Sequence, residues 1–148
     1  MFILRILFIF FICLNISNSY ASNIKNSAVV FMYHKFGVSK YPSTSVTLDQ
    51  FDAHLKEFSK SKYSVKPVEL IIDTIINDGN LPKNTIGISI DDADKSFYEV
   101  GWPKFKSMGF PVTLFVNTST IHENNKNYLN WSQIRELVNE GVSIGAHS

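Results

Sequence analysis

The feature that most constrains the fold is a regular alternation of apolar, strand-like runs with amphipathic, helix-like segments. The strand-like runs are rich in β-branched and aromatic residues and lie at 28–33, 85–90, 112–116 and 142–146. Helix-like segments follow Thr47, begin near Pro67, span 96–108 and follow Asn130. Strands that alternate with helices in this way are typical of an α/β fold with a parallel sheet, either open or closed as a barrel.

The first 21 residues are a separate segment that takes no part in this alternation. A short start with one positive charge, Arg5, precedes an almost wholly apolar stretch at 6–16, and Ser19 and Ala21 then place small residues where a signal peptidase cuts. The apolar stretch has about 11 residues, whereas a bilayer span needs about 20. We therefore predict a cleaved signal peptide at 1–21, a mature domain at 22–148, and export to the periplasm, cell surface or medium. The alternative is an uncleaved membrane anchor.

Composition argues against a nucleic-acid-binding protein and against a domain stabilised by disulfides. The formal net charge is +1, so the sequence predicts no large basic surface and no nucleic-acid partner. The single cysteine, Cys13, lies inside the predicted signal peptide, so we expect no disulfide in the mature domain.

Side chains that are able to bind metal follow three of the predicted strands directly. They are His34, the adjacent pair Asp91 and Asp92, and His147. Functional residues of parallel α/β proteins gather where strands end and loops begin. The sequence therefore predicts a site built from these strand ends.

The adjacent carboxylates of Asp91 and Asp92 need an electrostatic explanation. Two neighbouring negative charges repel, and a bound cation or a shared proton would relieve that repulsion. Carboxylate and imidazole ligands suit zinc and related divalent metals, and a hydrolytic metal site also needs a general base. The pair could supply one ligand and one base, with His147 as a second ligand. The alternative is that the pair caps a helix in a solvated turn and that His147 is structural.

The segment from Ser89 to Ala93, with Asp91 and Asp92 at its centre, and the segments that follow it carry a recognisable order of motifs. In that order they resemble the polysaccharide deacetylase family, which is also called the NodB-homology domain or carbohydrate esterase family 4. That family has a strand with the motif Ser/Thr-Phe-Asp-Asp-Gly, then a helix that ends near Gly-Phe-Pro, then another apolar strand. The matching segments here are Ser89-Ile90-Asp91-Asp92-Ala93 and GFPVTLFV at 109–116. The segment WSQIRELVNEGVSIGAHS at 131–148 resembles the approach to the second family motif, His-Ser/Thr-x-x-His, and FMYHKFG at 31–37 resembles the family's first strand.

The resemblance implies a fold, a chemistry and a set of roles. The fold would be an incomplete (β/α) barrel of parallel strands and helices. The activity would be hydrolytic removal of N-acetyl groups from an amino-sugar polysaccharide or oligosaccharide. Asp91 matches the catalytic base, and Asp92 and His147 match ligands of a divalent metal, which would be zinc with cobalt or nickel as alternatives. His34 would line the site.

Two departures from the family pattern lead to further expectations. Ala93 replaces the usual glycine, so we expect the turn after Asp92 to avoid positive φ. The second metal histidine of the family would fall beyond Ser148, so we expect residues 22–148 to form only the N-terminal part of the barrel. Such a domain would leave a parallel sheet edge unpaired, and we expect it to be weakly stable and inactive by itself.

Two other functions remain open from the sequence. The chain could be a non-catalytic carbohydrate-binding or structural remnant of such an enzyme. It could also be a glycoside hydrolase that uses Asp91 and Asp92 as its acid and base. Glycosidase carboxylates stand about 5–9.5 Å apart across the scissile bond, which adjacent residues at one strand end fit poorly.

Overall fold

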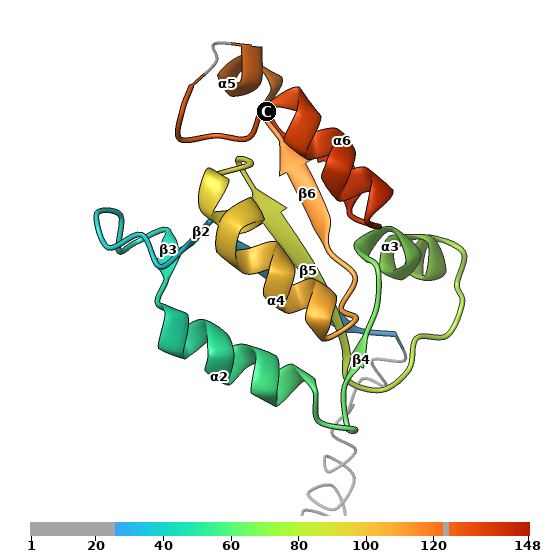
Figure 1. The fold of residues 1–148 in the computed structure, drawn as a ribbon. Helices are drawn as coiled ribbons and strands as arrows, with labels where there is room; N and C mark the ends of the chain where they lie inside the picture. The colour runs from blue at the N-terminus through green and yellow to red at the C-terminus, as the bar shows by residue number, and fades with distance from the viewer. Residues whose placement is uncertain (1–25, 123–124) are drawn as a thin grey trace, which may run out of the picture.

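The computed structural model describes residues 26–122 and 125–148, so the predicted signal peptide lies outside the described residues. A five-stranded parallel sheet forms the centre of the protein (Figure 1). Its strands run in the order β1-β5-β6-β7, and the short strand β4 pairs with β5 as well. The bounds are Ala28–Tyr33 for β1, Ser64–Val65 for β4, Thr85–Asp91 for β5, Thr113–Val116 for β6 and Ser143–Ala146 for β7. The sheet is open, which confirms the predicted α/β fold without a closed barrel.

Helices connect these strands, and two of them begin with a complete capping box. The helices are α2 (Leu48–Phe58), α3 (Val68–Ile76), α4 (Trp102–Ser107), α5 (Thr118–His122) and α6 (Trp131–Asn139). Thr47 caps α2 with Gln50, and Asn130 caps α6 with Gln133, each through reciprocal bonds between side chain and backbone. Both predicted helix starts are thereby confirmed. A second, two-stranded sheet joins β2 (Lys35–Phe36) to β3 (Ser45–Val46).

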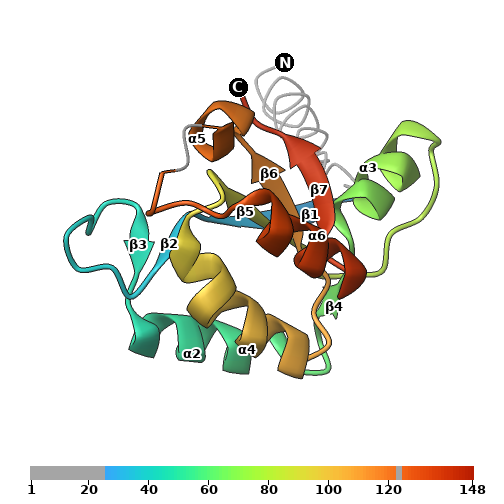
Figure 2. The same cartoon turned by 45° about the horizontal axis from the view of Figure 1, so that its top comes forward.

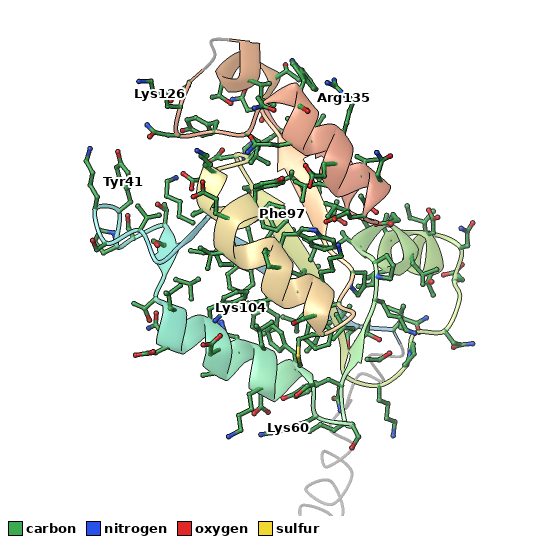
Figure 3. All side chains as sticks on the ribbon, in the orientation of Figure 1. Tyr41, Lys60, Phe97, Lys104, Lys126 and Arg135 are labelled. Atoms are coloured by element: carbon green, nitrogen blue, oxygen red, sulfur yellow. The ribbon has the colours of Figure 1, made fainter. Side chains whose placement is uncertain are left out.

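The main core lies on one face of the sheet, under α2, α4 and α6 (Figure 2). Alternate residues of β5 project into it, and Ile88 and Ile90 are fully buried there. Phe51 of α2 and Phe105 of α4 meet above them with ring centroids 4.9 Å apart. Phe97 also points inward, whereas Lys60, Lys126 and Arg135 extend from the surface (Figure 3). This packing fixes the direction in which β5 carries Asp91 and Asp92.

Helix α3 packs against the opposite face of the sheet. A Cβ atom at Gly87 of β5 would come within 3.1 Å of Ile71 and 3.2 Å of Val68. The helix therefore approaches the strand closely at a glycine, which has no side chain. Glu69 in the first turn of α3 accepts hydrogen bonds from Thr113 of β6 and Ser143 of β7. These contacts place the first turn of α3 beside the first residues of β6 and β7.

Strand β1 differs from its prediction as a buried strand. Val29, Val30 and Met32 are 58%, 45% and 60% exposed. The reason is tertiary, because β1 is an edge strand that pairs with β5 alone among the described residues. An apolar run shows that a segment suits a strand, but not how many neighbours the strand will have.

The helix expected at 96–108 is also different, because it consists of two parts. A π-helical turn, η1 (Phe97–Gly101), precedes α4, and the backbone N–H of Trp102 donates to the carbonyl oxygen of Phe97. Pro103 lacks a backbone N–H. In an ordinary α-helix its ring would also clash with the carbonyl group of the residue four positions earlier. The wider turn of η1 accommodates this proline without ending the helix.

Candidate functional site

The structure brings Asp91, Asp92 and His147 together at the carboxyl ends of β5 and β7. Asp91 is paired with Phe115 of β6, which is paired in turn with Gly145 of β7. The backbone N–H of His147 donates to the carbonyl oxygen of Val116 at 3.0 Å and so continues this ladder. Because side chains alternate along a strand, Asp91 and His147 emerge on the same face of the sheet.

The imidazole of His147 faces both carboxylates. Its Nε2 atom lies 3.6 Å from Oδ2 of Asp91 and 3.5 Å from Oδ1 of Asp92. The three side chains are 28%, 17% and 35% exposed in the order His147, Asp91, Asp92, so they are partly shielded but open to a ligand. On the other side of the ring, Nδ1 of His147 lies 2.9 Å from the main-chain oxygen of Ser148. That oxygen can only accept, so the contact is a hydrogen bond when Nδ1 carries the proton, and a neutral imidazole of that tautomer presents the lone pair of Nε2 to the carboxylates.

The spacing of these donor atoms suits a divalent cation. Zinc binds imidazole nitrogen and carboxylate oxygen at about 2.0–2.2 Å, so two ligands at a tetrahedral angle stand about 3.4 Å apart. The 3.5 Å between Nε2 of His147 and Oδ1 of Asp92 is close to that separation. Across residues 26–122 and 125–148, however, no group of three or more His, Cys, Asp or Glu side chains is arranged to hold a metal ion. Asp92 and His147 are the two predicted metal ligands that the structure brings together.

The turn that carries the carboxylates is strained, contrary to the expectation from Ala93. Asp92 has a φ of 72° and Ala93 a φ of 58°, both in the left-handed region. The sequence-based expectation that alanine would avoid positive φ is wrong, because contacts with a distant segment hold the turn. The carbonyl oxygen of Ala93 accepts from the backbone N–H of Leu129 at 2.9 Å, and the next residue forms a β-bridge with Tyr128.

Asp94 is a functional candidate that the sequence analysis did not identify. This residue is 6% exposed, and its Oδ1 accepts hydrogen bonds from the backbone N–H of Ser96 at 2.9 Å and from its hydroxyl at 2.6 Å. Its Oδ2 lies 3.7 Å from Nζ of Lys35. The signal was present as Asp-x-Ser, since aspartate side chains often bond to the backbone two residues on.

His34 lies apart from the contacts among Asp91, Asp92 and His147. It follows β1 directly and lines a cavity of about 310 Å³ with Tyr33, His54 and residues 43–46. In that cavity Oη of Tyr33 is 2.9 Å from Nδ1 of His54, and burial raises the pKa of Tyr33. Within the described part of the chain, no hydrogen bond or ion pair joins His34 to Asp91, Asp92 or His147. Its role in lining the site remains a prediction.

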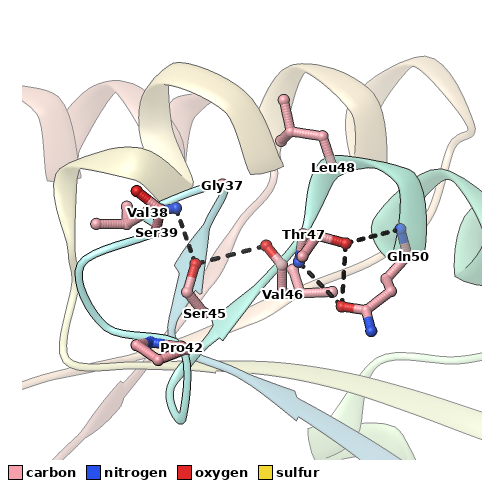
Figure 4. Close-up of a pocket in the computed structure, with 9 residues that line it drawn as sticks. All are labelled: Gly37, Val38, Ser39, Pro42, Ser45, Val46, Thr47, Leu48 and Gln50. Atoms are coloured by element: carbon pink, nitrogen blue, oxygen red, sulfur yellow. Dashed lines mark hydrogen bonds between the residues drawn. The ribbon is translucent and has the colours of Figure 1, made fainter.

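A larger cavity, of about 460 Å³, lies beside the loop 37–46 and the start of α2 (Figure 4). Its lining includes the hydroxyl of Ser45, which accepts a hydrogen bond from the backbone N–H of Val38 at 2.9 Å, and the capping box of Thr47 and Gln50. The lining contains no carboxylate, imidazole or other ionisable side chain, and it shares no residue with the strand-end cluster. This cavity therefore lacks the ionisable side chains that the strand-end cluster contains.

Comparison with known proteins confirms the resemblance that the motifs indicated. The sequence model of the polysaccharide deacetylase family matches residues 78–148. YxkH of Bacillus subtilis (strain 168), named as a polysaccharide deacetylase, is 27% identical over 120 residues, which are 80% of this chain and 41% of that protein. The poly-beta-1,6-N-acetyl-D-glucosamine N-deacetylase of Staphylococcus aureus (strain N315) is 25% identical over 126 residues, which are 85% of this chain and 42% of that protein. The chain thus spans about two fifths of the length of these relatives.

Solved structures of deacetylases share the fold. The Streptococcus pyogenes deacetylase PplD in complex with acetate superposes with a TM-score of 0.72 and 23% identity, covering 82% of this chain and 56% of that one. IcaB from Ammonifex degensii superposes with a TM-score of 0.69 and 22% identity, covering 82% of this chain and 53% of that one. The alternating parallel strands and helices of this chain therefore have the arrangement that these deacetylases have.

Proposed function

We propose that this chain, whose residues 78–148 match the polysaccharide deacetylase family, carries the base and two metal ligands of a hydrolase that removes N-acetyl groups from an amino-sugar polysaccharide. The observation that carries the proposal is the approach of Nε2 of His147 to within 3.6 Å of one carboxylate and 3.5 Å of its neighbour. A base and two metal ligands placed at one accessible edge are among the parts that metal-assisted amide hydrolysis uses.

Each of the three side chains has a separate role in this proposal. Asp92 and His147 would hold a divalent metal, with zinc as the first choice and cobalt or nickel as alternatives. A metal bound there would lower the pKa of a bound water and polarise the acetamide carbonyl. Asp91 would accept the proton of the attacking water, since its Oδ2 lies 3.6 Å from Nε2 of His147, one of the two ligands. In the neutral imidazole, the Nδ1 bond of His147 to Ser148 would leave Nε2 available to bind the metal.

The substrate class follows from the chemistry and from the named relatives. The Staphylococcus aureus relative is named for N-deacetylation of poly-β-1,6-N-acetyl-D-glucosamine. We infer a polymer or oligomer of N-acetylated amino sugars for this chain, for which N-acetylglucosamine oligomers are the direct probe. Such polymers lie outside the cytoplasmic membrane, which agrees with the export signal predicted at 1–21. Among the residues that the structure describes, no helix has the length and apolar character that crossing a membrane demands.

A carbohydrate-binding or structural role without catalysis is the second candidate. The observation in its favour is that only two residues with ligand roles, Asp92 and His147, meet in the described part of the chain. This alternative predicts that sugar binding, where present, is independent of zinc and of Asp91.

Release of acetate from N-acetylglucosamine oligomers tests the proposed activity. The assay would use this chain continued by the C-terminal portion of the Staphylococcus aureus relative, because the match covers 42% of that protein. A general base contributes about 10²–10⁴-fold to a rate, so Asp91→Asn should lower kcat at least about 100-fold. Asp52→Asn, on the exposed side of α2, is the matched control and should leave kcat unchanged. Full activity of Asp91→Asn would exclude Asp91 as the base.

A further inference from the structure

The turn at Asp92 and Ala93 holds two consecutive residues in the left-handed region, with φ of 72° and 58°. Neither is glycine, and a side chain at such a position meets steric resistance that glycine does not. Ala93 is also completely buried, so its side chain cannot relieve the strain by moving into solvent. Interactions elsewhere must therefore impose the conformation.

The carboxylate of Asp94 is the centre of those interactions. It accepts two hydrogen bonds from Ser96 through Oδ1, at 2.9 Å and 2.6 Å, and faces Nζ of Lys35 through Oδ2 at 3.7 Å. The hydroxyl of Ser96 accepts in turn from the backbone N–H of Phe36 at 3.0 Å. The side chain of Asp94 thus joins the turn to η1 on one side and to β2 on the other.

A second set of bonds fixes the other edge of the same turn. The backbone N–H of Leu129 donates to the carbonyl oxygen of Ala93 at 2.9 Å, and the N–H of Lys95 donates to that of Asn127 at 2.9 Å. These bonds act on the main chain and survive a change of side chain at position 94. Loss of the Asp94 carboxylate would therefore free the β2 side of the turn while the loop 125–129 still held the other side.

We propose that Asp94 is a positioning residue, which holds the Asp92–Ala93 turn in its left-handed conformation and so sets the distance between the carboxylate of Asp92 and the imidazole of His147. In the described part of the chain, no hydrogen bond or ion pair joins the side chain of Asp94 to either of these two side chains. This inference rests on the proposed function for its consequence, but the conformation of the turn is a separate, measurable property of the chain.

The structural test is the backbone conformation at Asp92 and Ala93, read from Cα and Cβ chemical shifts and from the coupling between the amide and α protons. The wild-type chain should report left-handed values at both positions. Asp94→Ala should shift them away from those values, whereas Asp94→Asn should retain them largely, because asparagine keeps the acceptor oxygen for Ser96. Unchanged left-handed values in Asp94→Ala would overturn the proposal.

The functional test is zinc affinity by isothermal titration of the same chains. Residues that do not bind a metal themselves but orient its ligands contribute about 10–100-fold to metal affinity. Asp94→Ala should therefore weaken zinc binding by that factor. Combining it with Ala93→Gly should restore most of the loss, because glycine enters the left-handed region without the steric penalty. A residue that only stabilises the fold would give no such rescue.

Two controls separate this role from general destabilisation and from failure of the proposed function. Thr85→Val removes the hydrogen bond from Thr85 to the carbonyl oxygen of Pro82 at the opposite end of β5, and should lower stability without changing zinc affinity. Ala53→Gly on the exposed face of α2 should not rescue Asp94→Ala. If the wild-type chain bound no zinc, the metal roles of Asp92 and His147 would fail, while the backbone measurement would still decide the role of Asp94.

Discussion

Nε2 of His147 lies 3.5 Å from Oδ1 of Asp92, although the strands that carry them, β7 and β5, are separated in the sheet by β6. This separation is longer than an ordinary hydrogen bond. Two zinc ligands at a tetrahedral angle would stand at about this separation. The relationship supports the proposal that the cluster holds a metal, which the solvated-turn alternative does not require.

The aromatic core under the sheet should be the main determinant of stability. Phe105 is fully buried, and its ring centroid lies 4.9 Å from that of Phe51 and 6.1 Å from that of Phe36. Phe105→Ala should therefore lower the free energy of unfolding by about 3–5 kcal/mol, measured by urea denaturation. Met108→Ala, at a side chain that is 40% exposed, is the matched control and should change it by less than about 1 kcal/mol. Equal effects of the two variants would contradict the described core.

Gly145 should not tolerate a side chain, because of its neighbour on β6. A Cβ atom there would lie 2.5 Å from the ring of Phe115. Gly145→Ala should lower the free energy of unfolding by about 1–3 kcal/mol, and Phe115→Leu in the same chain should recover part of that loss. Thermal and urea unfolding of the two single variants and the double variant measure this coupling. Strict additivity of the two substitutions would mean that the contact is absent.

The contact between Glu69 and the sheet should give a pH-dependent contribution to stability. Partial burial disfavours the charged carboxylate, but hydrogen bonds from Ser143, from its own backbone and from Thr113 outweigh this and lower the pKa of Glu69. A lowered folded pKa means that the contribution is complete above the unfolded value, about 4.3, and is lost as the pH falls through the folded value. Wild type should thus be more stable than Glu69→Gln at pH 7, by less than about 1 kcal/mol because the carboxylate is largely exposed.

The pH dependence of the stability difference between wild type and Glu69→Gln tests this assignment directly. The difference between wild type and Glu69→Gln should shrink when urea unfolding is repeated at pH values below 4. Asp73→Asn, further along α3, serves as the control for a carboxylate without these partners. A difference that grew on acidification would show that the hydrogen bonds do not favour the charged form of Glu69.

The sequence predicted most of what local rules determine. The strand-like runs and the caps at Thr47 and Asn130 appear in the structure close to their predicted bounds. The proximity of Asp91, Asp92 and His147 was predicted as well, because parallel strands bring their carboxyl ends to one edge whatever the loops do. These features depend on residue type and order along the chain.

The features that the sequence did not predict depend on distant contacts. Ala93 adopts positive φ because Leu129 and the Asp94 network hold it, and neither contact can be read from the motif itself. The exposure of Val30 follows from the edge position of β1, which the apolar run does not encode. The wide turn of η1 depends on how Pro103 is accommodated within a helix that tertiary packing retains.

The most direct test of the account is the zinc affinity of the chain, measured by isothermal titration for wild type, Asp92→Ala and His147→Ala. The account predicts that wild type binds zinc and that each variant loses at least about tenfold in zinc affinity, because each substitution removes one direct ligand of the same metal. His54→Ala, which removes a histidine bonded to Tyr33 outside the site, should bind zinc as wild type does. Equal zinc affinity in wild type, Asp92→Ala and His147→Ala would contradict the central claim.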